Sequence, residues 1–126
     1  MSVYKDIGLN YARNAGADLS DKLYYLAKVD TDGDIILASA GTDSVLGAIS
    51  ETAAQDHPVT VQFGGIAKVI AGAAITAGAR VTSDGNGKAV STTTAGDRVC
   101  GIALWAAGAA NEIIPVALVP GHIATS

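Results

Sequence analysis

The chain has 126 residues, a net charge of −4 and a hydrophobic content of 49%. This length suits one domain, and the eight Lys and Arg residues are scattered singly, so no basic stripe exists to neutralise nucleic-acid phosphates. No apolar run approaches the roughly 20 residues of a membrane-spanning helix, and the N-terminus has no apolar signal region. We therefore expect a protein that is made inside the cell and binds neither nucleic acid nor membrane.

Residues 1–16 differ from the rest of the chain because they show neither helical nor strand periodicity. Their larger apolar side chains are Val3, Tyr4, Ile7, Leu9 and Tyr11. A segment with this composition is unlike a disordered polar tail. We interpret it as an extended N-terminal arm that contacts another chain, followed by a single β domain over residues 17–126.

The β domain is expected to be duplicated, because one strand-and-turn pattern occurs twice between residues 29 and 119. Both copies join short β-branched runs through Asp-Gly or Gly-Asp pairs, which are typical of strands and tight turns. The pattern predicts pseudo-repeats over about 17–66 and 73–120. Asp32-Gly33 and Asp84-Gly85 should form equivalent turns, with a register drifting from 52 to 55 residues, and Val45 and Val99 should occupy matching buried sites. Many short strands with frequent turns favour an all-β barrel or sandwich.

Three short motifs could suggest a ligand but are better explained as structure. The run Asp30-Thr-Asp32-Gly33-Asp34 lacks the glycine at position six and the glutamate at position twelve of a calcium loop. Asp-Gly and Asn-Gly pairs instead favour hairpin turns. The Gly85-Asn-Gly87 run has no helix pattern after it that would hold a phosphate, so it is also interpreted as a turn.

No constellation of catalytic residues occurs in the sequence. His57 and His122 are far apart, and no serine is bracketed by nucleophile-elbow glycines. We therefore expect no enzyme activity, no cofactor and no metal. Cys100 is expected to be a small core residue. Trp105 stands at the exit of a predicted strand, where it either caps the core or anchors a subunit contact.

Two stretches carry a family resemblance. One runs from Lys68 through Gly72, Ile75-Thr-Ala-Gly78 and Val81-Thr-Ser-Asp84-Gly-Asn-Gly87 to Val90. The other is Asp97-Arg-Val-Cys-Gly101-Ile-Ala-Leu, followed by an Ala/Gly-rich loop and a final aliphatic strand. Together they resemble the small capsid decoration (cement) proteins of tailed bacteriophages, over roughly residues 17–120.

The resemblance implies a β-rich protein, commonly trimeric, on the outer face of an expanded icosahedral head. There it would stabilise contacts between major capsid subunits against the pressure of internal DNA, after synthesis in the host cytoplasm. It implies a virion protein with no catalytic residue, with the major capsid protein as partner. The candidate contact residues are those of the arm together with Trp105.

Two other interpretations remain open at this point. The Ala71-Gly72-Ala-Ala-Ile75-Thr-Ala-Gly78 pattern also resembles β-clip domains of the antifreeze-like type, which implies a binding module for a carbohydrate or protein ligand. Lys88 faintly resembles the modified lysine of lipoyl or biotinyl carrier domains, although the flanking acidic residue is missing and no clear hairpin tip is predicted there.

Overall fold

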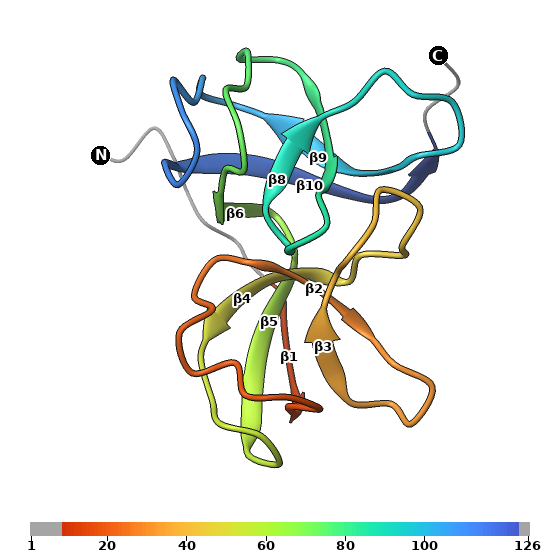
Figure 1. Cartoon of the computed structure of the whole chain (residues 1–126), viewed down its shortest axis with the longest axis vertical. Coiled ribbons are helices and arrows are strands. Elements are labelled where there is room, and N and C mark those ends of the chain that lie inside the picture. The colour runs from red at the N-terminus through yellow and green to blue at the C-terminus, as the bar shows by residue number, and fades with distance from the viewer. Residues whose placement is uncertain (1–8, 124–126) are drawn as a thin grey trace.

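The structure is a computed structural model that describes residues 9–123, and the side chains of residues 9–118. These residues form two five-stranded antiparallel sheets, one above the other in Figure 1, and contain no helix. The first sheet has the order β1-β5-β4-β2-β3. Its strands are β1 (Leu9–Asn14), β2 (Leu26–Val29), β3 (Ile35–Leu37), β4 (Gly47–Glu51) and β5 (Pro58–Gly64).

The second sheet repeats the first strand for strand, in the order β6-β10-β9-β7-β8. Its strands are β6 (Ile66–Ile70), β7 (Arg80–Ser83), β8 (Ala89–Ser91), β9 (Arg98–Ala103) and β10 (Ile113–Ile123). We call residues 9–64 the first unit and residues 66–123 the second unit. The predicted all-β fold built from two pseudo-repeats is confirmed, as an open sandwich-like arrangement rather than a closed barrel.

The turns between β2 and β3 and between β7 and β8 are equivalent, but their register differs from the predicted one. Asp30 Oδ1 accepts hydrogen bonds from the backbone N–H groups of residues 32 and 34. Asp84 Oδ1 does the same for residues 86 and 88. Gly33 and Gly87 take the positive φ that each turn needs, at 86° and 78°. The equivalent of Asp84 is therefore Asp30 and not Asp32, because two Asp residues in one turn made the sequence alignment ambiguous.

With this correction the two units align at an offset of 54 residues over β2–β4 and β7–β9. Val45 and Val99 then fall on equivalent positions, and both are buried as predicted. Gly47 and Gly101 are also equivalent. A Cβ atom on Gly47 would collide with the Gln62 carbonyl oxygen, and one on Gly101 with the Ala117 carbonyl oxygen. Both units therefore need glycine at the point where β4 or β9 closely approaches the backbone of the paired strand, β5 or β10.

The first unit begins earlier in the chain than the predicted repeat, because β1 pairs with β5 and lies where β6 lies in the second sheet. Ala15 makes a parallel bridge to Ile35, as Ala71 does to Ala89. Residues 9–15 are thus part of the first sheet, which corrects the interpretation that the whole of residues 1–16 lies outside the repeat. Alternation of polar and apolar residues is weak in β1 because all six side chains are exposed.

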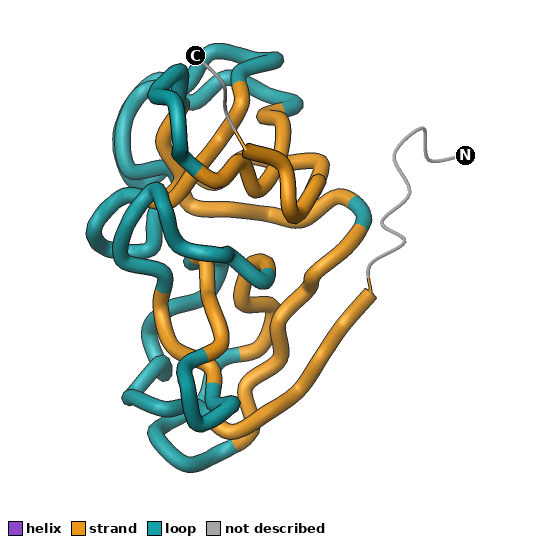
Figure 2. The backbone as a smooth tube through the Cα atoms, turned by 90° about the vertical axis from the view of Figure 1, so that its right-hand side faces the viewer, coloured by secondary structure: helices purple, strands orange, loops and turns teal. Residues whose placement is uncertain are grey.

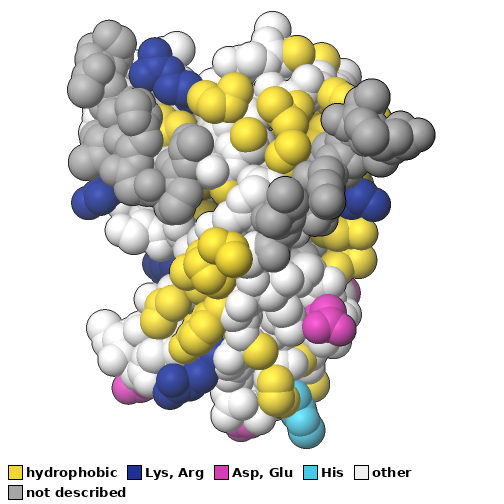
Figure 3. All heavy atoms as spheres, turned by 180° about the vertical axis from the view of Figure 1, so that it is seen from behind, with side chains coloured by type: hydrophobic (Ala, Val, Ile, Leu, Met, Phe, Trp, Pro, Cys, Tyr) yellow, Lys and Arg dark blue, Asp and Glu magenta, His cyan; other side chains and the backbone are white. Residues whose placement is uncertain are grey.

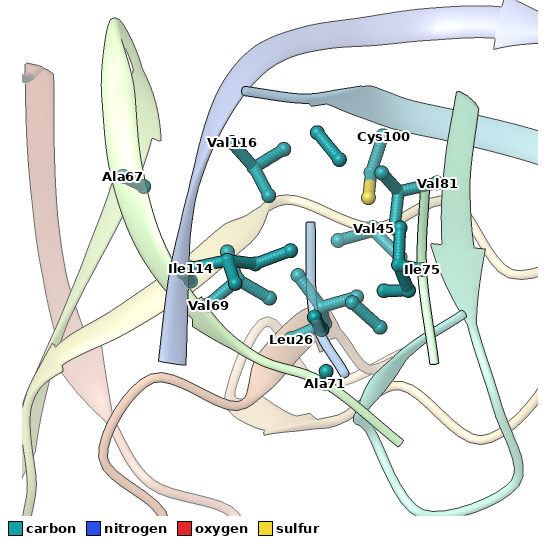
Figure 4. Packing of buried hydrophobic residues seen from close by; sticks show 14 of the residues in the cluster. Leu26, Val45, Ala67, Val69, Ala71, Ile75, Val81, Cys100, Ile114 and Val116 are labelled. Carbon is teal, nitrogen blue, oxygen red and sulfur yellow. The ribbon is translucent and has the colours of Figure 1, made fainter. Parts of the chain in front are cut away.

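The buried hydrophobic side chains form two clusters, and only the larger one joins the two units. The smaller cluster lies within the first unit, around Ile35, Ile49 and Val61. The larger one contains the equivalent positions of the second unit and also side chains contributed by the first, among them Leu26, Ala38 and Ala48. Figure 4 shows Leu26 beside Val69 and Ile114 of the second unit. Burial of Leu26 alone stabilises the contact between the units by roughly 1.5–3 kcal/mol.

Candidate interaction surface

The strand β1 is an edge of the first sheet, and Figure 2 shows it as the outermost strand on its side of the molecule. Leu9 and Tyr11 are 58% and 40% exposed. Leu9 lies next to Gly64, where no Cβ separates it from the backbone of β5. The structure therefore places both predicted contact residues on an accessible strand. The other predicted arm residues, Val3, Tyr4 and Ile7, lie outside the described part of the chain.

A second apolar surface lies on the second unit, around Trp105. This side chain is 67% exposed, so the interpretation of Trp105 as a cap over the core is wrong. It lines an open groove of about 610 Å³ together with Tyr24, Lys68, Leu104, Ile113 and Pro115. Figure 3 shows that apolar side chains lie over both halves of the molecule on the face opposite that of Figure 1. Neither Leu9 nor Tyr11 lines the groove, so the structure does not bring all the predicted contact residues into one site.

Sequence reasoning missed the groove residues that surround Trp105. β10 contains the continuous apolar run Ile113-Ile-Pro-Val-Ala-Leu118, in which the residues that face the core cannot be told from those that face out. In the structure Ile114 and Val116 are buried, whereas Ile113 is 43% exposed. The sequence did contain a signal for the groove. A strand that is apolar on both faces needs a packing partner on both faces, so an uncovered face of residues 113–118 indicates a binding surface.

The groove has one cationic side, formed by Lys68 on β6. Its Nζ lies 6.0 Å from the centre of the Tyr24 ring. Such a contact lets a lysine lie along an apolar wall while its ammonium group stays in water. The groove therefore suits a partner that is mainly apolar and carries an acidic or carbonyl group at its edge.

Three titratable groups among the described residues are perturbed by their surroundings. Hydrogen bonds with Ser20 lower the pKa of Asp18, and the other two groups, Asp43 and Cys100, are structural. Lys28 Nζ lies 2.9 Å from Asp43 Oδ2 and donates a hydrogen bond that lowers the pKa of this carboxyl group, with help from the Ser39 N–H. Burial raises the pKa of Cys100 to about 12, so its thiol is neutral and fills the core as predicted. Among the described residues no group of three or more His, Cys, Asp or Glu side chains could share a metal ion.

The remaining motifs have structural positions. The Asp30–Asp34 and Gly85–Gly87 runs are hairpin turns, as predicted. His57 is exposed before β5 and its carbonyl accepts the Ala15 N–H; the side chain of His122 is outside the described residues. Lys88 lies at the base of the β7–β8 turn, where its carbonyl accepts the Asp84 N–H, so it is not at the hairpin tip, as expected. Its ammonium group donates to Asn111 Oδ1 at 2.7 Å.

Comparison with known proteins gives the class of the molecule. The model of the phage cement protein family matches residues 24–118. This match spans most of both units, so the chain belongs to the phage cement protein family. Membership gives it a capsid-associated structural role in the virion, as the resemblance in its sequence had implied.

A solved structure shares the fold over nearly the whole chain. It is described as the head fiber gp8.5 N base in bacteriophage phi29, with a TM-score of 0.69 and 19% sequence identity. The similarity covers 90% of this chain and 95% of that one. At this identity the match concerns the fold alone. No curated protein matches the sequence, and no helix in the described part of the chain is long and apolar enough to span a membrane.

Proposed function

We propose that the protein is a non-enzymatic decoration protein that binds the outer surface of an expanded phage head and stabilises contacts between neighbouring major capsid subunits. It acts as a homotrimer. The observation that carries the proposal is the groove around Trp105 in a chain of the phage cement family. Trp105, Leu104 and Ile113 are all more than 40% exposed and line one groove, whereas the exposed Leu9, Tyr11, Leu23 and Val29 do not line it.

Exposed apolar surface of this kind supports a protein partner. Tryptophan is enriched at the energetic centres of protein interfaces, because a large ring loses much contact with water on binding. Burying Trp105 and its two neighbours would contribute roughly 1.5–3 kcal/mol per side chain before ordering costs. Each copy then adds a modest free energy, and many copies on one particle add these increments together.

Binding to empty heads tests the proposal. We expect Trp105→Ala to weaken binding to expanded, undecorated heads by about tenfold or more, which corresponds to about 1.4 kcal/mol. The thermal unfolding of the free variant should stay close to that of the parent, because the side chain is mostly in water.

The matched control is Val29→Ala, which shortens a side chain that is 45% exposed on the first unit, outside the groove. It should bind as the parent does. Equal binding of Trp105→Ala and the parent to heads would contradict the role of the groove. Failure of the parent protein to bind expanded heads at all would contradict the proposed function itself.

A further inference from the structure

We propose that copies of this chain join head to tail by repeating, between molecules, the contact that holds the two units of one molecule together. The first unit of one copy then contacts the second unit of the next as the second unit contacts the first within a chain. The inference takes only the number of copies, three, from the proposed function. The interface itself is argued from the internal contact.

The internal contact is heterologous, which means that the two units use different faces. The Leu26 N–H donates to the Gly87 carbonyl, and the Ile70 N–H donates to the Tyr24 carbonyl. A two-fold relation would also pair the equivalent residues the other way round, Arg80 with Gly33 and Asn14 with Gly78. No backbone hydrogen bond of this kind occurs among the described residues. On each unit, therefore, one face contacts the other unit of the same chain, and the face equivalent to the one used by that other unit has no contact within the chain. We call this second face the open face.

A heterologous contact between similar bodies can be repeated until a ring closes or a filament forms. Here the open face of the second unit contains Gly78, Arg80 and Ile102, which are the equivalents of Tyr24, Leu26 and Ala48. The open face of the first unit is formed by β1 and by the β2–β3 turn. These are the equivalents of β6 and the β7–β8 turn, which cover Leu26 inside the chain.

The two open faces are complementary in polarity. Arg80 is exposed on the second unit and would meet the turn that contains Asp30, Asp32 and Asp34, beside which the Arg13 guanidinium group already lies. Tyr11 of β1 takes the place of Ala67, which is buried in the internal contact. Its ring would therefore cover Ile102, which is only half-buried in the single chain. Three carboxylates would then face two guanidinium groups, those of Arg13 and Arg80, and this excess of acid together with the apolar pair favours this docking direction.

The place where equivalent residues meet indicates the rotation axis. Ser44 and Val45 line one small cavity with their own equivalents, Arg98 and Val99. The Arg98 N–H also donates to the carbonyl of Gly41 in the equivalent loop. In a rotational arrangement, residues contact their own equivalents only close to the axis. Three copies would therefore form a ring of six units around this cavity, with alternating internal and intermolecular contacts.

A cysteine pair that copies the geometry of the internal contact provides the test. A Cβ atom on Gly85 would lie 3.9 Å from the carbonyl oxygen of Ser39 in the first unit. The equivalent pair between copies is Thr31 with Thr93, and both are exposed. Disulfides need Cα atoms about 4.4–6.8 Å apart, so only a specific contact closes them. Cys100 is buried and is kept in all variants, and the parent chain is oxidised in parallel as the control for this cysteine.

Under mild oxidation, the double variant T31C/T93C should give covalent dimers and trimers and no larger products. The single variants should give no self-linked product, and a mixture of the two singles should give dimers only. The matched control S39C/G85C should close a disulfide within one chain. The experiment is run on free protein and on protein bound to expanded heads.

Absence of intermolecular links in both settings, while S39C/G85C closes, would overturn the proposal. So would self-linked dimers of T31C alone, because these require a two-fold contact, or a ladder that extends beyond the trimer, because that indicates an open filament. Linked trimers that do not bind heads would leave this interface intact and contradict only the proposed function.

Discussion

β1 and β6 occupy the same place in their sheets, yet the two positions that β6 buries are exposed in β1. Ala67 and Val69 of β6 are buried, whereas the equivalent Tyr11 and Arg13 of β1 are exposed. A second pair of equivalent positions differs in the same way: Leu26 of the first unit is fully buried, whereas Arg80 of the second unit is exposed. The comparison teaches that the backbone fold of a unit depends on its turns and on the close backbone contacts at Gly47 and Gly101. The polarity of the side chains on a face depends instead on whether that face is covered within the chain.

The largest expected effect concerns the glycines that both units share. Gly101→Ala should destabilise the protein by more than about 3 kcal/mol, because the new methyl group meets the Ala117 carbonyl and the Val116 side chain. Gly47→Ala should do the same against the Gln62 carbonyl. Chemical denaturation measures both. Gly85→Ala is the control, since its Cβ meets no atom closer than 3.9 Å. If Gly101→Ala or Gly47→Ala keeps the parent stability, the close backbone contacts at these two glycines are not equivalent.

The next effect separates the covered face from the open one. Leu26→Ala should cost about 2–3 kcal/mol of stability, because a fully buried leucine leaves a cavity between the units. Arg80→Ala at the equivalent position should change the stability of the single chain by less than about 0.5 kcal/mol. Urea unfolding under dilute conditions compares them. Similar losses for both variants would mean that the two faces are equally covered.

The smallest effect concerns the ion pair that only the first unit has. Asp43→Asn should lower stability at pH 7 by about 1 kcal/mol or less, because the exposed part of the pair is screened by water. The pKa of Asp43 is lowered in the folded protein, so its contribution is complete above the unfolded value and disappears as the pH falls through the folded value. The difference between parent and variant should therefore vanish in acid.

Asp97→Asn is the matched control in the second unit. Asp97 Oδ2 accepts a hydrogen bond from the Thr92 hydroxyl at 2.6 Å, which an amide oxygen can also accept. Its effect on stability at pH 7 should be smaller than that of Asp43→Asn. A pH-independent loss for Asp43→Asn in thermal unfolding between pH 2 and pH 7 would show that the lysine pair contributes nothing.

Much of the fold was predictable because it depends on local signals. The Asp-Gly and Asn-Gly turns and the matching valines indicated two equivalent β units. β1 could not be predicted as a strand, since all its side chains face solvent and alternation needs one covered face. The groove could not be predicted either, because Ile113 and Ile114 are the same residue type on opposite faces. Exposure of Trp105 depends on how β9 leaves the sheet, which no local pattern contains.

The passage from one unit to the next has a consequence for the order of folding. Only Gly65, with a φ of 77°, separates β5 from β6. Yet β6 finds its sheet neighbour in β10, which begins more than 40 residues later, and β10 also completes the pairing of β9. Such non-local pairing makes β proteins fold slowly, over milliseconds to seconds. A growing chain can therefore complete its first sheet on the ribosome. The second sheet must wait for β10, which lies between β6 and β9, and Ala67 and Val69 stay exposed until that strand is made.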